Sequence, residues 1–237
     1  MAEARVSGLG GRQHARQNAR GGAEDPTRSR ILATTAAMFA EHGIDAVSIR
    51  AIAEAASVNV AAVNYHFGSK DMLHIEVFRE VARRSAERRL ATLDRILGEA
   101  EASGRRPALD AILASFVDAY VNADAPRDGV LLAQLVLKHR VSPTAWTEAV
   151  VRDELDHLAA RYFAAIAAAA PELSIEDVHW RYHMMAGAVV MTLSDNRAGR
   201  RIQRLSGDLC RTDEAEGMRA AILRFLGAAF SVGPGGG

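Results

Sequence analysis

The chain has 237 residues, of which 49% are hydrophobic, and its 29 Lys and Arg balance its 29 Asp and Glu. This length allows one large or two modest globular domains, and the zero net charge would be unusual for a protein that coats nucleic acid nonspecifically, but it suits one with a local binding face. Cys210 is the only cysteine, which excludes an intrachain disulfide and a cysteine cluster for zinc.

Residue types and spacing favour an all-α protein. Ala, Leu, Glu and Arg are abundant, there are only six Pro, and no stretch alternates long enough to indicate a sheet. No apolar run reaches the length of a membrane span, and the N-terminus lacks the apolar segment of a signal peptide, so we expect a cytoplasmic protein. Residues 1–25 are predicted to be a disordered basic tail and residues 233–237 a flexible one.

The first predicted helix runs from Pro26 to Gly43, with Pro at its start and Gly just past its end. Its apolar positions recur every three or four residues and form one stripe, composed of Ile31, Leu32, Thr35, Met38 and Phe39. This stripe can pack across two further helices.

Two short helices follow, separated by a turn at Ser57. Ser48 is a suitable N-cap for the first of them, and Asn59 is one for the second. The second helix directs Val63 and Phe67 inward and ends at Gly68, after which Ser69 begins another helix. Helices this short need a third partner to bury enough surface, and the helix from Pro26 supplies it.

The segment TRSRILATTAAMFAEHGIDAVSIRAIAEAASVNVAAVNYHFGSKDML resembles the DNA-binding domain of TetR-type transcriptional regulators over some forty-five residues. Three separate features agree with that family, namely a helix that ends in FAEHG, the capped helix SIRAIA and the helix end YHFGSK. The resemblance implies a three-helix helix-turn-helix domain over residues 26–70 and a helical effector-binding and dimerisation domain over residues 71–232. It implies a homodimeric repressor of double-stranded operator DNA that is not an enzyme and has no cofactor.

The resemblance also assigns roles to single residues. Residues 59–66 correspond to the recognition helix, which fits the DNA major groove. Phosphate contacts fall on Thr27, Ser48, Tyr65, His66 and Lys70, with Arg50 adding a charge on the same side.

The sequence departs from the usual family pattern around this helix. Ser57 stands where relatives often have Gly, and a turn that needs positive φ would then cost about 1 kcal/mol. Val60, Ala62 and Asn64 replace more polar residues, so base reading depends on Asn64 pairing with adenine and on Ala62 and Val60 touching thymine methyl groups.

Each assignment has a plain structural alternative. Tyr65 and His66 could cover the seam between helices, Asn59 is first of all a cap, and Lys70 with Asp71 could be a solvated helix start.

The remainder reads as a set of helices. The first is predicted from Ser69 to about Leu97, and the others near residues 108–122, 129–139, 143–169, 174–193 and 214–230. The helix from Trp180 to Leu193 is apolar on more than one side, with Met184, Met185, Ala188, Val189 and Leu193 on one stripe. A second stripe consists of Met218, Ala221, Ile222, Phe225 and Ala229. These stripes fit the family's four-helix dimer interface; burial within one subunit is the alternative.

The C-terminal part resembles fatty-acid-responsive TetR-type repressors of the PsrA kind, on the segments VHWRYHMMAGAVVMTLSD and DLCRTDEAEGMRAAILRFLGAAF. The resemblance implies a small-molecule effector such as a long-chain fatty acid or its coenzyme A ester. Candidate lining residues are Phe116, Tyr120, Leu131, Leu135, Phe163, Trp180 and Met184, each of which could equally be ordinary core. His179 and His183 lie one turn apart, but a third metal ligand is not evident, so we expect no metal.

Two other functions remain open at this stage. The chain could be an all-α small-molecule-binding protein or enzyme without DNA binding, although it has no phosphate-binding Gly loop, G-x-S-x-G or H-E-x-x-H motif. It could also be a regulator that responds to a protein rather than to a small molecule.

Overall fold

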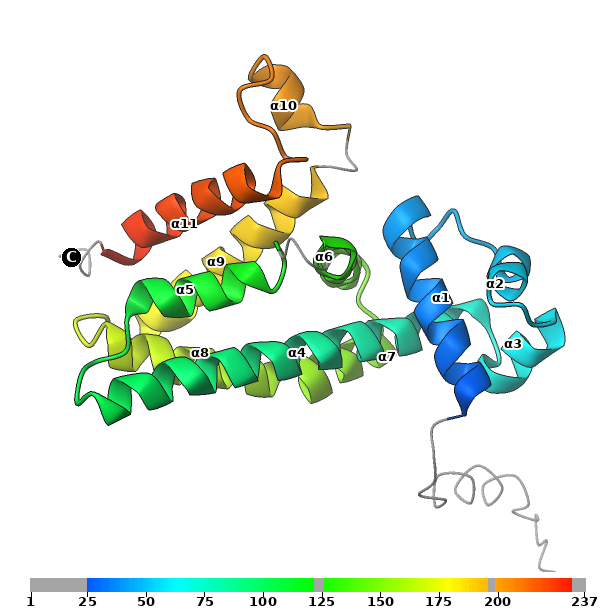
Figure 1. Ribbon diagram of the computed structural model, residues 1–237, viewed down its shortest axis with the longest axis horizontal. Coiled ribbons are helices and arrows are strands. Elements are labelled where there is room, and N and C mark those ends of the chain that lie inside the picture. The colour runs from blue at the N-terminus through cyan, green and yellow to red at the C-terminus, as the bar shows by residue number, and fades with distance from the viewer. Residues whose placement is uncertain (1–24, 122–125, 196–198, 232–237) are drawn as a thin grey trace, which may run out of the picture.

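The computed structural model describes residues 25–121, 126–195 and 199–231, and every regular element in these ranges is a helix, as expected (Figure 1). The expected tails, residues 1–25 and 233–237, lie outside the described residues except for Asp25. Within the described ranges, no helix combines the length and apolar character needed to cross a bilayer.

Helices α1 (Pro26–His42), α2 (Ile49–Ala55) and α3 (Val60–Phe67) form a unit at one end of the molecule (Figure 1). The predicted caps are present. The Ser48 hydroxyl accepts a hydrogen bond from the backbone N–H of Ala51 at 3.2 Å, and the Asn59 side chain accepts one from Ala62 at 2.7 Å. The core of the unit is apolar and buried, and it includes Ile31, Phe39, Ile52, Val63 and Phe67.

Helix α4 (Lys70–Ala102) leads from this unit along the length of the larger part (Figure 1). It ends five residues later than the sequence predicted, because the stretch 98–102 contains good helix formers and Arg95 pairs with Glu99 at 2.8 Å. The chain reverses after it through Gly104, whose φ of 60° suits Gly.

The rest of the larger part surrounds α4. Helix α5 lies along α4, α11 lies beside α5 and α9, and α6 packs between α9 and α1, so that it joins the two parts of the molecule (Figure 1). The elements are α5 (Leu109–Asp118), α6 (Pro126–Val141), α7 (Ala145–Val150), α8 (Asp156–Ala169), α9 (Ile175–Ser194), α10 (Arg201–Leu205) and α11 (Ala215–Ser231).

Besides the positions of helix ends, two features differ from the expected helices. The single helix predicted for residues 143–169 is interrupted by a π-helical segment, η2 (Val151–Leu155), between α7 and α8. This wide turn carries Asp153 and Glu154 to Arg79 of α4, whose Nη1 lies 3.4 and 3.3 Å from their carboxylates. The short helix α10 was not expected, because its Arg-rich sequence has no apolar periodicity.

Candidate nucleic-acid interface and effector core

The turn between α2 and α3 is a Schellman-type helix end that places Ser57 in the left-handed region. Ser57 has φ 53°, its N–H donates to Glu54 O at 3.0 Å, and the N–H of Val58 donates to Ala53 O at 2.9 Å. The turn therefore does need a positive φ at residue 57, which is the case in which a residue other than Gly carries a conformational cost. The turn sets the direction in which α3 leaves α2.

Helix α3 is anchored on one side and open on the other. Val63 and Phe67 are buried, and the guanidinium of Arg28 lies 5.3 Å from the centre of the Phe67 ring. On the opposite side Val60 and Asn64 are exposed, and Tyr65 is 80% exposed. A large aromatic side chain that protrudes this far is available for a partner.

His66 is placed differently from its neighbour Tyr65. Its side chain is only 12% exposed, its Nε2 lies 3.7 Å from a carboxylate oxygen of Asp25, and its ring meets Tyr65 edge-on at 5.2 Å. This position agrees with the alternative in which His66 covers the seam between helices. The ring lies where α3 meets the start of α1.

The other predicted DNA contacts lie around α3 at helix starts. Thr27 and Lys70 are half-buried in the first turns of α1 and α4, while Ser48 and Arg50 are exposed at the start of α2. A further member of the predicted set, Ala62, is half-buried near the start of α3.

The three-helix unit contacts the larger part at polar and aromatic points. Lys138 of α6 donates to the Asp45 carboxylate at 2.6 Å, and this hydrogen bond lowers the pKa of Asp45. His74 of α4 packs edge-on against Phe39 of α1, with ring centres 5.8 Å apart. Burial, assisted by the charge of Lys138, lowers the pKa of His74, which favours its neutral form.

A cavity of about 480 Å³ opens beside this junction, between the start of α4, the end of α6 and the start of α7. Met72, Ile75, Phe78 and Trp146 contribute apolar surface to it. Of the effector-lining residues predicted from the sequence, Leu135 also borders this cavity, while Leu131 is buried one turn away on α6.

Three predicted lining residues meet in an aromatic cluster inside the larger part. The Phe116 ring lies 5.7 Å from that of Tyr120 and 5.4 Å from that of Tyr162. The Tyr182 ring is 5.5 Å from Phe116 and 4.8 Å from Phe163. The cluster therefore joins α5, α8 and α9.

Trp180 and Met184, two further residues of the predicted lining, lie outside this cluster. They are 57% and 61% exposed, and they lie on the outer side of α9 rather than in the aromatic cluster. The reason is that α9 is apolar on two sides, and the sequence does not distinguish the side that faces the cluster from the side that faces out.

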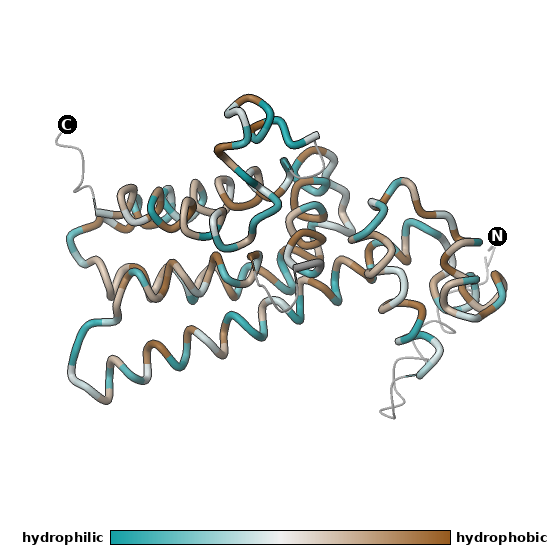
Figure 2. Tube along the Cα trace, turned by 45° about the horizontal axis from the view of Figure 1, so that its top comes forward, coloured by the Kyte–Doolittle hydropathy of each residue, from teal (hydrophilic) through white to brown (hydrophobic). Residues whose placement is uncertain are grey.

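These exposed residues belong to an apolar face formed by α9 and α11. The buried positions Met185 and Val189 of α9 and Ile222 of α11 pack inside the subunit. Several large apolar side chains of the same two helices remain exposed, namely Trp180, Met184, Met191 and Phe225. Each predicted stripe is therefore split, with one part in the core and another at the surface. Hydrophobic positions, in brown, alternate with hydrophilic ones, in teal, along the helices of the molecule (Figure 2).

The sequence analysis overlooked Arg89, which is buried beside the aromatic cluster. Arg89 belongs to a series of buried α4 residues at four-residue spacing, which also contains Val77, Val81, Ser85 and Leu93. A charged residue inside such a series is the signal that could have identified it. In the part of the chain that the structure describes, no three metal-ligating side chains gather. His179 instead stacks on Phe163, with ring centres 4.2 Å apart.

Comparison with known proteins gives two family matches. Residues 110–229 match the family "Tetracyclin repressor-like, C-terminal domain", and residues 31–77 match "Bacterial regulatory proteins, tetR family". Together they run from residue 31 in α1 to residue 229 in α11, and residues 78–109, which include most of α4, lie between the two matches.

Individual relatives agree with these matches. The transcriptional repressor AcnR of Corynebacterium glutamicum is 39% identical over 66 residues, which cover 27% of this chain and 35% of AcnR. The repressor KstR2 of Rhodococcus jostii is 30% identical over 125 residues, 51% of this chain and 54% of KstR2. The chain thus spans between a third and about half of the length of these relatives. A crystal structure of a putative transcriptional regulator from Saccharomonospora viridis, in complex with choline, has a TM-score of 0.64 at 19% identity, covering 86% of this chain and 97% of that one.

Proposed function

This chain belongs to the TetR family of bacterial transcriptional regulators, and from that premise we propose that it is a ligand-released repressor that binds a palindromic operator as a homodimer. The observation that carries the proposal is α3, a capped helix anchored by Val63 and Phe67 with its opposite face exposed. A helix presented in this way fits the major groove.

We assign the reading of bases to the exposed face of α3. Asn64 can pair with adenine through its amide, while Val60 and Ala62 can contact thymine methyl groups. Phosphate contacts fall to Tyr65, which protrudes, and to Lys70. Thr27, Ser48, Arg50 and Asn59 surround α3 and complete the proposed DNA-binding set, whereas the covered position of His66 supports a role in fixing α3 against α1.

The dimer would form through the exposed apolar face of α9 and α11. Trp180, Met184, Met191 and Phe225 have no polar function that explains their exposure, and soluble monomers seldom leave a contiguous group of large apolar side chains in water. A two-fold axis through this face pairs each patch with its own copy. It also gives the molecule two recognition helices, as a palindromic site requires.

The effector would bind in the larger part, and a long-chain fatty acid or acyl-CoA fits the apolar and aromatic character of its interior. Phe116, Tyr120 and Phe163 supply the aromatic surface. The structural neighbour from Saccharomonospora viridis was crystallised with choline, a cation. In this chain the charge of the buried Arg89 would repel a cation placed beside it.

Release from DNA would follow from a tilt of α4, whose first turn carries Lys70 and whose middle carries Arg89. An effector can cause this tilt only to the extent that it binds the tilted form more tightly than the DNA-binding form. A tilt in both subunits changes the spacing between the recognition helices and weakens binding to a site with fixed half-site spacing.

The test is binding of the purified full chain to duplex DNA from the promoter regions of its own locus, followed by footprinting with and without palmitate or palmitoyl-CoA. We expect a protected palindrome whose protection decreases when the effector is added. A protein that binds no duplex from its locus at low ionic strength would contradict the proposed function, because phosphate attraction is strongest there.

A further inference from the structure

Arg89 is a buried cation, and two of its donor nitrogens have no hydrogen-bond partner among the described residues. The side chain is 3% exposed, and its guanidinium carbon lies 4.3 Å from the centre of the Tyr120 ring and 5.0 Å from that of Phe116. Among the described residues, no acceptor lies within hydrogen-bond distance of its Nε and Nη2. The two rings satisfy part of the charge, but an aromatic face accepts no conventional hydrogen bond from the guanidinium edge.

Ser85 adds a second unused donor on the same face of α4. It lies one helical turn before Arg89, is equally buried, and its hydroxyl has no hydrogen-bond partner in the described part of the chain. Burying an unpaired charge and an unpaired hydroxyl together is unfavourable unless a bound group supplies the acceptor. A partner that carries negative charge and acceptor oxygens would satisfy both.

Among the described residues, two acidic side chains of the elements around this part of α4 are paired with other arginines. Asp118 accepts two hydrogen bonds from Arg219, at 2.5 and 3.1 Å, and Asp128 lies 3.7 Å from Arg88. The phenols cannot supply the charge either, because burial raises the pKa of both Tyr162 and Tyr182, which the charge of Arg89 offsets only in part. Both phenols therefore remain protonated and neutral at physiological pH.

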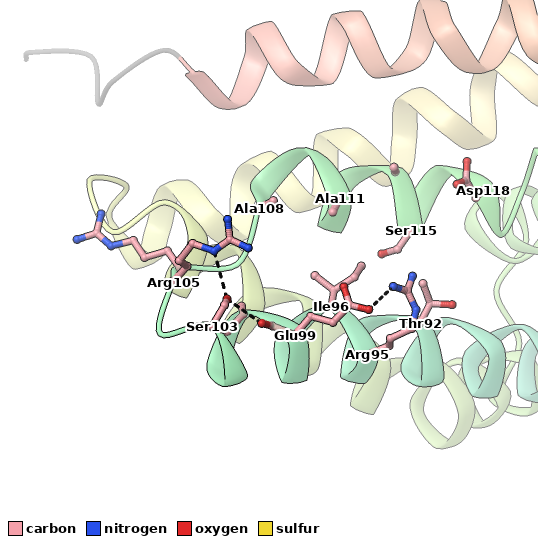
Figure 3. A pocket seen from close by; sticks show the side chains of 13 residues that line it. Thr92, Arg95, Ile96, Glu99, Ser103, Arg105, Ala108, Ala111, Ser115 and Asp118 are labelled. Atoms are coloured by element: carbon pink, nitrogen blue, oxygen red, sulfur yellow. Dashed lines mark hydrogen bonds and ion pairs between the residues drawn. The ribbon is translucent and has the colours of Figure 1, made fainter.

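A groove lies between α5 and the part of α4 that follows Arg89 in sequence (Figure 3). It has a volume of about 430 Å³ and begins at the α4–α5 connection, where Arg105 and Arg106 are exposed. Its inner end is formed by Thr92, three residues after Arg89 on α4, and by Ser115, whose hydroxyl lies 2.9 Å from that of Tyr162. The groove thus ends within one helical turn of Arg89, and its entrance is cationic.

We propose that Arg89, with Ser85, binds the carboxylate of the effector, and that the effector is a free carboxylic acid with an apolar body rather than an ester, thioester or cation. This inference rests on the proposed function, since it names the chemical class that releases the repressor. The planar guanidinium presents Nε and Nη2 as a fork that matches the two oxygens of a carboxylate. The apolar body would lie against Phe116, Tyr120 and Tyr182.

The test compares acids with their uncharged counterparts on the full chain. Octanoate, palmitate and phenylacetate are titrated by calorimetry and by thermal shift, beside octanamide, palmitamide, phenylacetamide and palmitoyl-CoA. We expect at least one acid to raise the melting temperature, with its amide at least tenfold weaker. An amide that binds as tightly as its acid, palmitoyl-CoA that binds more tightly than palmitate, or a panel in which no acid binds would each overturn the proposal.

Two variants separate binding from folding. Arg89→Met keeps the apolar stem of the side chain and removes the charge, while Arg88→Gln changes an exposed neighbour and serves as the control. We expect R89M to lose at least tenfold in affinity for the acid while its own melting temperature stays equal or rises, because a buried unpaired charge has been removed. R88Q should behave as the unmodified chain. An R89M protein that melts lower and binds the acid unchanged would show that Arg89 is structural.

Operator binding distinguishes failure of this inference from failure of the proposed function. Ligand-free R89M should bind the operator as the unmodified chain does, and the acid should no longer release it. If the unmodified chain binds no operator, the proposed function is wrong whatever Arg89 binds. If operator binding is normal and the acid releases R89M as readily as the unmodified chain, only the assignment of Arg89 is wrong.

Discussion

Replacing Ser57 by Gly should stabilise the protein, because Ser57 has a backbone conformation that disfavours side chains. At φ 53° the Cβ of Ser57 crowds its own carbonyl, at a cost of about 1–2 kcal/mol. Gly removes that cost, but its greater conformational freedom stabilises the unfolded chain by about 0.4–1 kcal/mol. The exposed hydroxyl contributes little. The net expectation is about 0.5–1 kcal/mol of added stability, or roughly 1–4 °C in melting temperature for a chain of this size.

Urea unfolding and thermal melting of Ser57→Gly measure this difference, with Ala55→Gly as the matched control. Ala55 ends α2 in ordinary helical conformation two residues earlier, so the same new residue should there lower stability by about 0.5–1 kcal/mol. The Schellman hydrogen bonds remain in S57G, so operator affinity should not fall. A loss of stability in S57G, or equal losses in both variants, would refute the assignment of strain to this turn.

Three further changes test other parts of the molecule. Tyr65→Phe with Lys70→Gln should weaken binding to all duplexes and reduce the slope of log affinity against log salt by about 1; an unchanged slope would contradict the phosphate assignment. Phe225→Glu places a charge in the exposed α9 and α11 face and should convert the proposed dimer to monomer in sedimentation experiments; a variant that stays dimeric would contradict the assignment of the interface to this face. Burial lowers the pKa of the His74 imidazole in the folded chain below its ordinary value of 6.5. As the pH falls, the unfolded chain therefore binds a proton at His74 before the folded chain does. The free energy of unfolding should decrease from about pH 6.5 down to the pKa of the folded state. His74→Gln should make that fall shallower in melts at successive pH values, and an unchanged profile would exclude His74 as its source.

The N-terminal unit could be predicted closely from the sequence because its information is local. Ser48, Asn59 and Ser69 are caps within three residues of the groups they bind, and Gly43 and Gly68 mark helix ends. The conformation of the Ser57 turn could be stated only as a condition, since a Ser at this position is compatible with either sign of φ.

The larger part was less predictable because its details depend on contacts between distant segments. The π-helical segment places Asp153 and Glu154 beside Arg79, which is more than seventy residues earlier. The two apolar sides of α9 have the same composition, so only packing shows that Met185 is inside and Met184 outside. Arg89 was overlooked because charged residues are seldom buried, although its spacing belongs to the buried series of α4.

The position of Arg89 on α4 bears on how a signal could reach the DNA. Arg89 and Lys70 are nineteen residues apart on one uninterrupted helix, about 28 Å at the usual rise, so a tilt of about 5° around Arg89 moves Lys70 by roughly 2.5 Å. The Asp45–Lys138 pair holds the three-helix unit to α6 and opposes such a movement, but Asp45 is 89% exposed and an ion pair in water contributes little. The stronger resistance comes from the packing of α1 on α6 and of Phe39 on His74. A carboxylate that binds Arg89 therefore has to favour the tilted form by more free energy than is lost from the packing that the tilt disturbs. The coupling between effector binding and DNA binding should for this reason depend on the apolar body of the ligand as well as on its charge.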